Sequence, residues 1–435
     1  MASWEPFKVI IAGGGVAGLT LACALEKAGV DFLLLEKREI APQTGASIIL
    51  QCHTARIFEQ LGIWKKILAA TFSLKGRLHF NEHGKLFDNS PIFKLVEERT
   101  GRPIVLIERR FCLETLYNGL EDKSRIRTNV GVVSFWEDEN GITVKTDSGD
   151  SIRGSILVAA DGVHSTIRSL LASTVSETDP ERYQYLTKGF TCSYRAVFGT
   201  SINGLESGMA RPLLPEGIIH HVYYRKASGI TAAGANRLLF WFLFIKEDEP
   251  SAAPSCPEYT ETDATATIEK YGHLLACPGY TFRNLWEARA HAGMVPMEEG
   301  VIQGPWNNGG RVVLVGDSIC KTTINAGFGG NLAVEGVCNL INELVPLLRE
   351  HTTPTTEDLV AAFSRYEHAQ RPRADISANT SHYVTRYESM DSIWLRFLRW
   401  LSPWIPLSYQ VKSFLDYMEP APILEFLADS DSSTP

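Results

Sequence analysis

The sequence predicts an α/β protein of more than one domain, and three observations lead to this fold class. Its 435 residues exceed the roughly 100–200 residues of a usual single domain. Short apolar runs of β type, at residues 8–12, 156–160 and 311–315, each lead into a glycine-bearing turn. Residues 184–290 differ, because they are rich in aromatic and β-branched residues. We therefore expect a parallel sheet with helices and an inserted antiparallel sheet.

Composition excludes several function classes. The net charge of −8 argues against nucleic acid as the main ligand. The eight cysteines are scattered without a CxxC pair, and no histidine cluster has zinc spacing, so we predict no metal site. We expect reduced thiols and a cytoplasmic location. No apolar run approaches about 18 residues, so we predict no transmembrane helix.

The first apolar run opens a βαβ unit with a nucleotide-binding pattern. The run at 8–12 stops at Gly13, and the glycines follow the form Gly13-x-Gly15-x-x-Gly18. Helical spacing covers residues 16–28, a second strand follows at 30–35, and Glu36 ends it. Glycines let backbone amides approach a pyrophosphate, and the acid accepts hydrogen bonds from a ribose. The pattern predicts a Rossmann-like dinucleotide-binding domain.

Two later strands carry further motifs. The run at 156–160 leads into Asp161-Gly162, which begins a DGxxSxxR sequence ending at Arg168. The run at 311–315 leads to Gly316-Asp317 and then to the glycine-rich segment 327–331, which opens a predicted helix at 332–347. The N-terminus of such a helix presents oriented N–H donors and a partial positive charge.

With these motifs, the chain resembles the FAD-dependent monooxygenases of the aromatic-hydroxylase type over residues 7 to about 350. It is most similar to the fungal branch that epoxidises prenyl chains of meroterpenoids and indole diterpenes. Short sequences shared with that branch occur in the same order along the chain: Ile40-Ala41-Pro42-Gln43, Gly45-Ala46-Ser47-Ile48, Gln60-Leu61-Gly62, Val197-Phe198-Gly199, Trp241-Phe242-Leu243-Phe244 and Glu299-Gly300.

The resemblance implies an FAD cofactor, with NADPH or NADH as reductant. It assigns Gly13, Gly15, Gly18 and Glu36 to the ADP part of FAD, and adds Ala46 and Asp161 to the binding set. Arg109 resembles the family's FAD-contacting arginine, although the adjacent Arg110 leaves the register open. Asp317 resembles the acid bonded to the flavin side chain. Gly330 resembles the position where backbone amides face the flavin ring, and such donors favour flavin reduction.

The domain organisation follows from these motifs. We assign residues 1–75, 106–183 and 291–355 to the FAD-binding domain. Residues 76–105 and 184–290 form the expected substrate domain, with strands at 187–200, 220–224 and 238–245. A C-terminal helical region at 356–428 and a disordered tail at 429–435 complete the chain.

Two residues of the substrate domain are candidates for catalysis. Arg195 follows Tyr194 on an apolar strand, and a buried arginine needs a carboxylate, carbonyl or phenolate partner. If it points outward, it is a solvated sheet residue instead. Tyr223 resembles a tyrosine of the fungal branch near the substrate, where its phenol donates a hydrogen bond. Core packing is the alternative for Tyr223.

Residues 383–425 combine tryptophans, leucines and arginines at helical spacing. We expect most of this region to pack over the substrate domain, with its Trp-rich part screening an apolar entrance. An amphipathic helix in peripheral contact with the cytoplasmic face of a membrane is the alternative.

The expected function is monooxygenation, by epoxidation or hydroxylation, of an apolar prenyl-derived metabolite with dioxygen. The sequence departs from the family at four positions beside the flavin site, namely Ile49, Cys320, Ile324 and Gly336 of the Glu335-Gly336 dipeptide, which usually reads Glu-Asp. These differences favour keeping an alternative, an oxidocyclase or dehydrogenase that abstracts a hydride without oxygen insertion. A prenyl-binding carrier without enzymatic activity is a third hypothesis, and the intact motif at Asp317 argues against it.

Overall fold

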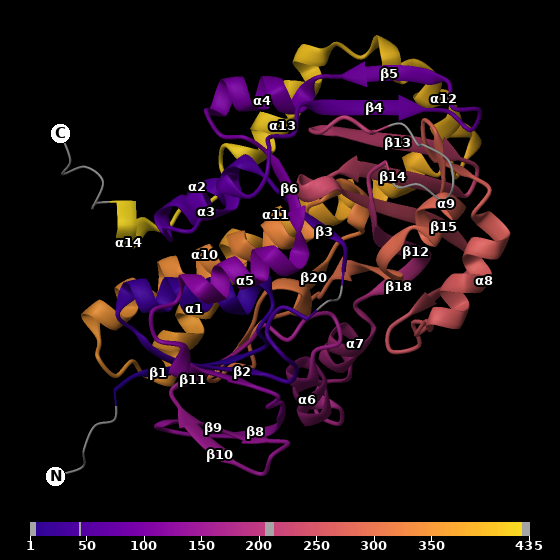
Figure 1. The fold of residues 1–435 in the computed structure, drawn as a ribbon. Helices are drawn as coiled ribbons and strands as arrows, with labels where there is room; N and C mark the ends of the chain where they lie inside the picture. The colour runs from indigo at the N-terminus through magenta and orange to yellow at the C-terminus, as the bar shows by residue number, and fades with distance from the viewer. Residues whose placement is uncertain (1–5, 43–44, 205–212, 429–435) are drawn as a thin grey trace, which may run out of the picture.

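The computed structural model describes residues 6–42, 45–204 and 213–428. Within them the chain forms two large sheets joined by long helices (Figure 1). Gln43 and the expected disordered tail at 429–435 lie outside the described residues.

The first sheet confirms the predicted βαβ unit. Five parallel strands lie in the order β19-β11-β1-β2-β7. Their bounds are β1 Lys8–Ala12, β2 Asp31–Glu36, β7 Ile126–Thr128, β11 Ile156–Ala159 and β19 Val312–Leu314. Helix α1 (Val16–Ala28) packs against α5 (Arg109–Gly119) and α10 (Gly329–Glu350). The three-stranded sheet of β8 (Val132–Asp138), β9 (Gly141–Thr146) and β10 (Ser151–Gly154) lies below the first sheet in the view of Figure 1.

The second sheet has eight strands in the order β20-β18-β12-β15-β14-β13-β4-β5. Its strands pair antiparallel except for β13 with β4. The bounds are β4 Gly76–Phe80, β5 Leu86–Ser90, β12 Thr191–Ile202, β13 Ile218–Tyr224, β14 Ala227–Ala233, β15 Leu238–Ala252, β18 Arg289–Val301 and β20 Cys320–Lys321.

Two details of this sheet differ from the sequence prediction. Thr187 and Lys188 belong to helix α7 (Pro180–Lys188), because Asp179 caps its N-terminus and Pro180 favours its first turn. The strand expected from 187 therefore begins at Thr191. Strand β18 extends the sheet through Val301, so it passes the boundary that we expected between residues 290 and 291.

The two faces of the large sheet are covered by different elements. Trp241, Leu243 and Ile245 point to one face and pack against α8 (Glu261–Tyr271) and α9 (Phe282–Glu287). Phe242 and Phe244 alternate to the opposite face, which packs against α4 (Ile92–Thr100) and α13 (Leu407–Met418). This second face is turned toward the helices of the first sheet.

Further elements connect the two sheets. The antiparallel pair β3 (Ser47–Leu50) and β6 (Val105–Glu108) contacts α5 and α10, and its Leu106 packs in the same cluster as Phe242 and Phe244. The long helix α11 (Thr356–Glu388) contacts α10, β13 and β18. The remaining elements are α2 Cys52–Gln60, α3 Trp64–Ala69, α6 Thr166–Val175, α12 Ile393–Leu401, α14 Glu425–Ala428, β16 Leu275–Cys277, β17 Tyr280–Thr281 and five 3₁₀ turns, η1 Lys123–Arg125, η2 Ala235–Arg237, η3 Gly316–Ser318, η4 Ile324–Ala326 and η5 Ser402–Trp404.

The C-terminal region is only partly packed, which corrects our expectation for its Trp-rich part. Helix α13 buries Val411 and Met418, whereas α12 has no buried residue. Trp394, Trp400 and Trp404 are 63%, 60% and 63% exposed. Among the described residues, no helix is both long enough and apolar enough to cross a membrane. All eight cysteines are unpaired thiols.

Candidate cofactor and substrate site

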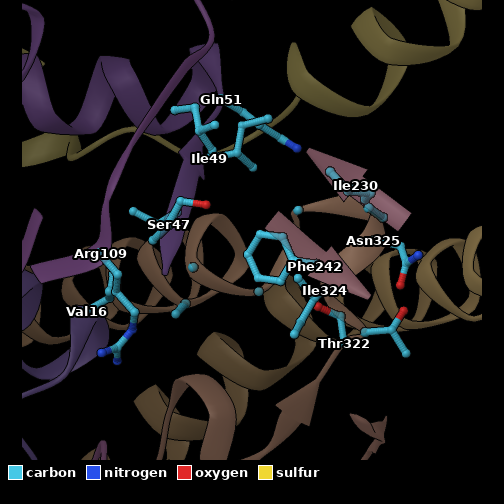
Figure 2. A pocket seen from close by; sticks show the side chains of 18 of the residues that line it. Val16, Ser47, Ile49, Gln51, Arg109, Ile230, Phe242, Thr322, Ile324 and Asn325 are labelled. Carbon is cyan, nitrogen blue, oxygen red and sulfur yellow. The ribbon is translucent and has the colours of Figure 1, made fainter. Parts of the chain in front are cut away.

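A cavity of about 340 Å³ lies between the first sheet and the inner face of the second (Figure 2). The segments after β1, β11 and β19 meet at its wall, as expected at the carboxyl ends of parallel strands. Val16 and Arg109 lie on one side of the view, Ile230 and Asn325 on the other, and the ring of Phe242 points between them. The cavity therefore brings together segments far apart in the sequence.

The glycine loop fits a bound diphosphate. Gly13 has a φ of +104°, and a Cβ there would lie 2.5 Å from the carbonyl oxygen of Ala160. A Cβ on Gly18 would lie 1.9 Å from the carbonyl oxygen of Gly13, so this glycine allows helix and turn to pack closely. A Cβ on Gly15, by contrast, would meet no atom within 4 Å, and Gly15 lines the cavity. The space beside Gly15 at the N-terminus of α1 is thus left open for a ligand.

Glu36 lies at the end of β2 beside this loop. Its carboxylate accepts hydrogen bonds from the backbone N–H of Gly14 at 2.6 Å and of Arg38 at 2.8 Å. These bonds hold the carboxylate at the carboxyl edge of the first sheet, where an acid accepts bonds from a ribose.

The two adjacent arginines, Arg109 and Arg110, have different surroundings in the structure. Arg109 lines the cavity and its backbone N–H donates to the carbonyl of Ala46 at 3.2 Å. Arg110 forms a surface ion pair with Glu114, with Nε 2.7 Å from Oε1. Ala46 is buried directly before the cavity-lining Ser47. The geometry supports Arg109 as the cofactor-facing arginine.

The DGxxSxxR motif ties the cavity wall to the core. Oδ2 of Asp161 accepts the backbone N–H of Ile167 at 3.1 Å, while burial raises the pKa of this carboxyl. The neighbours Ala160 and Gly162 line the cavity. Arg168 is buried and donates to three carbonyls, those of Leu186, Ser318 and Val163.

Asp317 and the N-terminus of α10 form the opposite wall. Asp317 lines the cavity and pairs with Lys321. Gly330 lines it too, and a Cβ there would lie 2.5 Å from Cδ1 of Ile48. The buried Asn331 fixes this wall, because it accepts from the N–H of Gln51 at 2.9 Å and donates to the carbonyls of Ile49 and Gly327 at 2.9 and 2.8 Å. Helix α10 begins at Gly329, three residues before the predicted start.

The large sheet supplies the apolar wall. Ile219, Ile230 and Phe242 line the cavity from β13, β14 and β15. Tyr223 shares the face of Ile219 but lies beyond the cavity lining, where its hydroxyl is 2.9 Å from Nδ1 of His79. Burial raises the pKa of Tyr223 well above 10.

Arg195 faces away from the cavity. It is opposite Ile245 in the β12 and β15 register, on the face that packs against α8 and α9. Its guanidinium pairs with Glu247. Of the predicted site residues, Gly15, Arg109, Asp317 and Gly330 line the cavity. Gly13, Gly18, Glu36, Ala46 and Asp161 belong to the adjoining segments, whereas Arg110 lies at the surface and Arg195 faces away.

Comparisons with known proteins agree with this geometry. Residues 6–187 match the family model described as "FAD binding domain". The chain is 32% identical to the FAD-dependent monooxygenase janM of Penicillium janthinellum, over 90% of this chain and 79% of that protein. It is 34% identical to the FAD-dependent monooxygenase penM of Penicillium crustosum, over 89% of this chain and 80% of that protein. The chain belongs to the FAD-dependent monooxygenases.

Solved structures share the fold at low identity. HpxO of Klebsiella pneumoniae, in complex with FAD and uric acid, has a TM-score of 0.74 and 17% identity, covering 97% of this chain and 100% of that one. p-Nitrophenol 4-monooxygenase PnpA from Pseudomonas putida DLL-E4 has a TM-score of 0.71 and 18% identity, covering 99% and 98%. The monooxygenase fold is thus confirmed along the chain.

The family departures fall at different places in this monooxygenase. Ile49 and Ile324 line the cavity. Cys320 is buried outside the cavity lining, and burial raises the pKa of its thiol. The Glu335-Gly336 dipeptide departs at Gly336. Glu335 before it is fully buried, with Oε1 2.8 Å from Nε2 of His53 and 3.0 Å from Nη2 of Arg373. It therefore joins α10 to α2 and α11, and its pKa is lowered because these partners outweigh burial.

Sequence reasoning missed several polar residues of the lining, namely Gln51, Arg77, His221, Lys321 and Asn325. His221 falls within the predicted strand at 220–224, where it reads as a sheet residue. The period-two alternation from Ile219 places it on the cavity face, but only the pairing of β13 with β4 brings Arg77 beside it. No local pattern signals that parallel pairing.

Proposed function

We propose that this monooxygenase uses NADPH or NADH to insert one atom of dioxygen, by epoxidation or hydroxylation, into a large apolar prenyl-derived secondary metabolite. The observation that carries the proposal is the continuity of one cavity from Gly15 and Gly330 to the apolar residues Ile219 and Phe242. The similarity to fungal FAD-dependent monooxygenases supports the reaction class.

Bound FAD supplies electron transfer and oxygen activation, and the chain supplies the surroundings. The open backbone at Gly15 and the carboxylate of Glu36 hold the ADP part, and Arg109 and Asp317 face the same space. Backbone N–H groups at the start of α10 stabilise negative charge at the ring. Phe242 and Ile230 exclude water and orient an apolar chain against the reacting end.

Tyr223 enters the proposal as a positioning residue. Its hydroxyl bonds to Nδ1 of His79, and the ring of His79 stacks on that of the cavity-lining His221 at 4.9 Å. Because burial keeps the Tyr223 phenol protonated, it holds the two histidines in place across the neutral range. Arg195 has no part in the proposed mechanism, since it faces the other side of the sheet.

A second candidate function rests on the apolar side chains at the family's flavin-facing positions. Ile49 and Ile324 both line the cavity, where they shape its wall without offering a proton donor. In this alternative, bound FAD would supply a hydride acceptor, and a hydroxyl of the substrate itself would trap the resulting cation with loss of a proton. Dioxygen would then take up the two electrons and two protons as hydrogen peroxide. NAD(P)H is then unnecessary.

One experiment separates the two reactions. The FAD-loaded protein is mixed anaerobically with NADPH, with a candidate prenylated substrate, or with both, and flavin absorbance is followed before isotope-labelled dioxygen is admitted. We expect bleaching that requires NADPH, and one labelled oxygen atom in the product. Bleaching by substrate alone with an unlabelled product overturns monooxygenation in favour of hydride abstraction.

We further propose that the protein works at the cytoplasmic surface of a membrane, in contact through α12 and the turn after it. The exposed Trp394, Trp400 and Trp404 support this location, because tryptophan favours the membrane interface. No acidic residue occurs between Asp391 and Asp416, while Arg396 and Arg399 add positive charge. An anionic bilayer is therefore the partner that fits this surface.

A further inference from the structure

The cavity ends in a polar group at the far side from the glycine loop. Arg77 reaches it from β4 and His221 from β13, the two neighbouring parallel strands of the large sheet. Ile230, which is opposite His221 in the strand register, lies across the cavity from Arg109 and Val16 in Figure 2. This end is therefore distinct from the part assigned to the cofactor.

The guanidinium of Arg77 lies over aromatic rings and has no directly paired acid, although Glu388 and Asp88 act on its charge from farther away. Its central carbon lies 5.1 Å from the ring centre of Phe93 and 5.3 Å from that of Phe414, and both rings also line the cavity. Among the described residues, the structure gives this guanidinium no hydrogen bond and no carboxylate within 4.0 Å, and its Nε is buried without a hydrogen-bond partner. A cation held over two aromatic rings retains its N–H donors for a ligand.

His221 adds a second polar group, and only one of its two ring nitrogens lies beside an acid. It is 3% exposed, and its Nδ1 lies 2.9 Å from Oε1 of Glu388. The other carboxylate oxygen of Glu388 accepts from Nδ2 of Asn325 at 2.6 Å. Glu388 is thus committed to His221 and Asn325, while Nε2 of His221 has no hydrogen-bond partner among the described residues.

We propose that Arg77, assisted by His221, forms a subsite for a negatively charged oxygen of the substrate, such as a carboxylate or the oxygen of an acidic enol or phenol. A bidentate acceptor matches the planar guanidinium. The substrate class is then amphipathic, with an apolar chain along Phe242 and one anionic head at Arg77. The inference that the apolar chain of the substrate reacts rests on the proposed function. The anionic head group is inferred from the geometry alone.

Binding of three probes to the oxidised, FAD-loaded protein tests the subsite without turnover. The probes are 4-hexylbenzoate, 4-hexylbenzyl alcohol and 4-hexylbenzylamine, which share one apolar body and differ in the head. Affinities come from titration calorimetry and from the perturbation of the flavin spectrum. We expect the carboxylate to bind about tenfold more tightly than the alcohol, and the amine to bind most weakly.

Variants assign the preference to Arg77. In Arg77→Met the carboxylate is expected to bind about tenfold more weakly, with the alcohol little changed, and Arg77→Lys to keep part of the preference. Arg289→Met is the matched control, because Arg289 also lies over an aromatic ring, Trp286, but outside the cavity lining. It should keep the full preference.

Equal affinity of the carboxylate and the alcohol in the unchanged protein overturns the subsite, whether or not Arg77→Met folds. An unchanged preference in a folded Arg77→Met protein overturns it as well. Failure of the proposed function looks different, because the preference for the carboxylate then persists while labelled oxygen is absent from the product.

Discussion

Nη1 of Arg168 donates a 2.8 Å hydrogen bond to the backbone carbonyl of Ser318. This bond joins the end of the DGxxSxxR motif to the turn that carries Asp317, although the two lie far apart in the sequence. The same guanidinium also donates to the carbonyls of Val163 and Leu186 and stacks on Phe190 at 4.9 Å. Arg168 therefore fixes two cofactor-binding segments relative to each other.

Replacing Arg168 by Met is expected to destabilise the protein by at least about 2 kcal/mol, because three buried carbonyls lose a charged donor. Chemical denaturation measures this change, and release of FAD is expected at lower denaturant concentration. Arg365→Met is the control, since Arg365 forms a surface ion pair with Glu343 that contributes about 0–1 kcal/mol. Equal stability of the two variants would contradict the role of Arg168.

Gly15→Val should remove FAD and leave the fold intact. A Cβ at this position would meet no protein atom within 4 Å, and the valine side chain enters the space expected for the diphosphate. We expect FAD affinity to fall by at least about tenfold, with far-ultraviolet circular dichroism unchanged. Gly18→Val is the contrasting variant. It should fail to fold, because its Cβ would collide with the carbonyl oxygen of Gly13. Full FAD loading of Gly15→Val would refute the placement of the diphosphate.

The adjacent arginines form a matched pair for the next test. Arg109→Met is expected to weaken FAD binding by about 1–3 kcal/mol, because Arg109 lines the cavity. Arg110→Met should leave FAD binding unchanged, since Arg110 pairs with Glu114 at the surface. Titration of FAD into the cofactor-free proteins measures both. If Arg110→Met weakens FAD binding and Arg109→Met does not, then Arg110 is the arginine that faces the cofactor.

Local sequence patterns were sufficient to predict the elements of the cofactor-binding half of the molecule. Strand β1 and helix α1 have the predicted bounds, because an apolar run, three glycines and an acid at fixed spacing leave few other structures. The substrate half depends on long-range pairing. Strand β4 lies beside β13 through a parallel pairing of distant segments, so the closeness of Arg77 and His221 had no local signal.

The orientation of Arg195 shows a related limit. Alternation along β12 determines which residues share a face, but not which face meets the cavity. That choice depends on where α8 and α9 pack, and these helices lie far along the chain. The same reason explains α12, whose amphipathic pattern is local while its lack of a covering partner is a property of the whole fold.

Stability should depend on pH through His220. Burial lowers the pKa of this imidazole to about 4, from 6.5 in an unfolded chain. Between these values the unfolded chain binds the proton more strongly, so stability present above pH 6.5 is lost as the pH falls toward 4. The loss is on the order of 3 kcal/mol.

His220→Gln is expected to flatten this part of the stability curve, measured by urea denaturation at several pH values. His79 adds a loss of the same sign, because burial holds its pKa well below 6.5. His83→Gln is the control, since His83 lies on the surface. A His220→Gln protein with the original pH dependence would show that another group titrates in this range.

Membrane contact through α12 is tested by sedimentation with vesicles. Trp394, Phe397, Trp400 and Trp404 form a continuous row of exposed rings, with neighbouring centres 5.5, 6.0 and 4.8 Å apart. We expect the protein to bind vesicles of phosphatidylcholine and phosphatidylserine more than vesicles of phosphatidylcholine alone, and less at high salt.

Replacing the three tryptophans by Ser should abolish binding while FAD stays bound, because α12 has no buried residue and lies outside the cavity lining. Trp136→Ser is the matched control, since Trp136 is 47% exposed on β8, away from this row. Vesicle binding that survives the triple replacement would contradict the proposal, and a concentration-dependent dimer that the replacement abolishes would assign the row to a second copy of the chain instead.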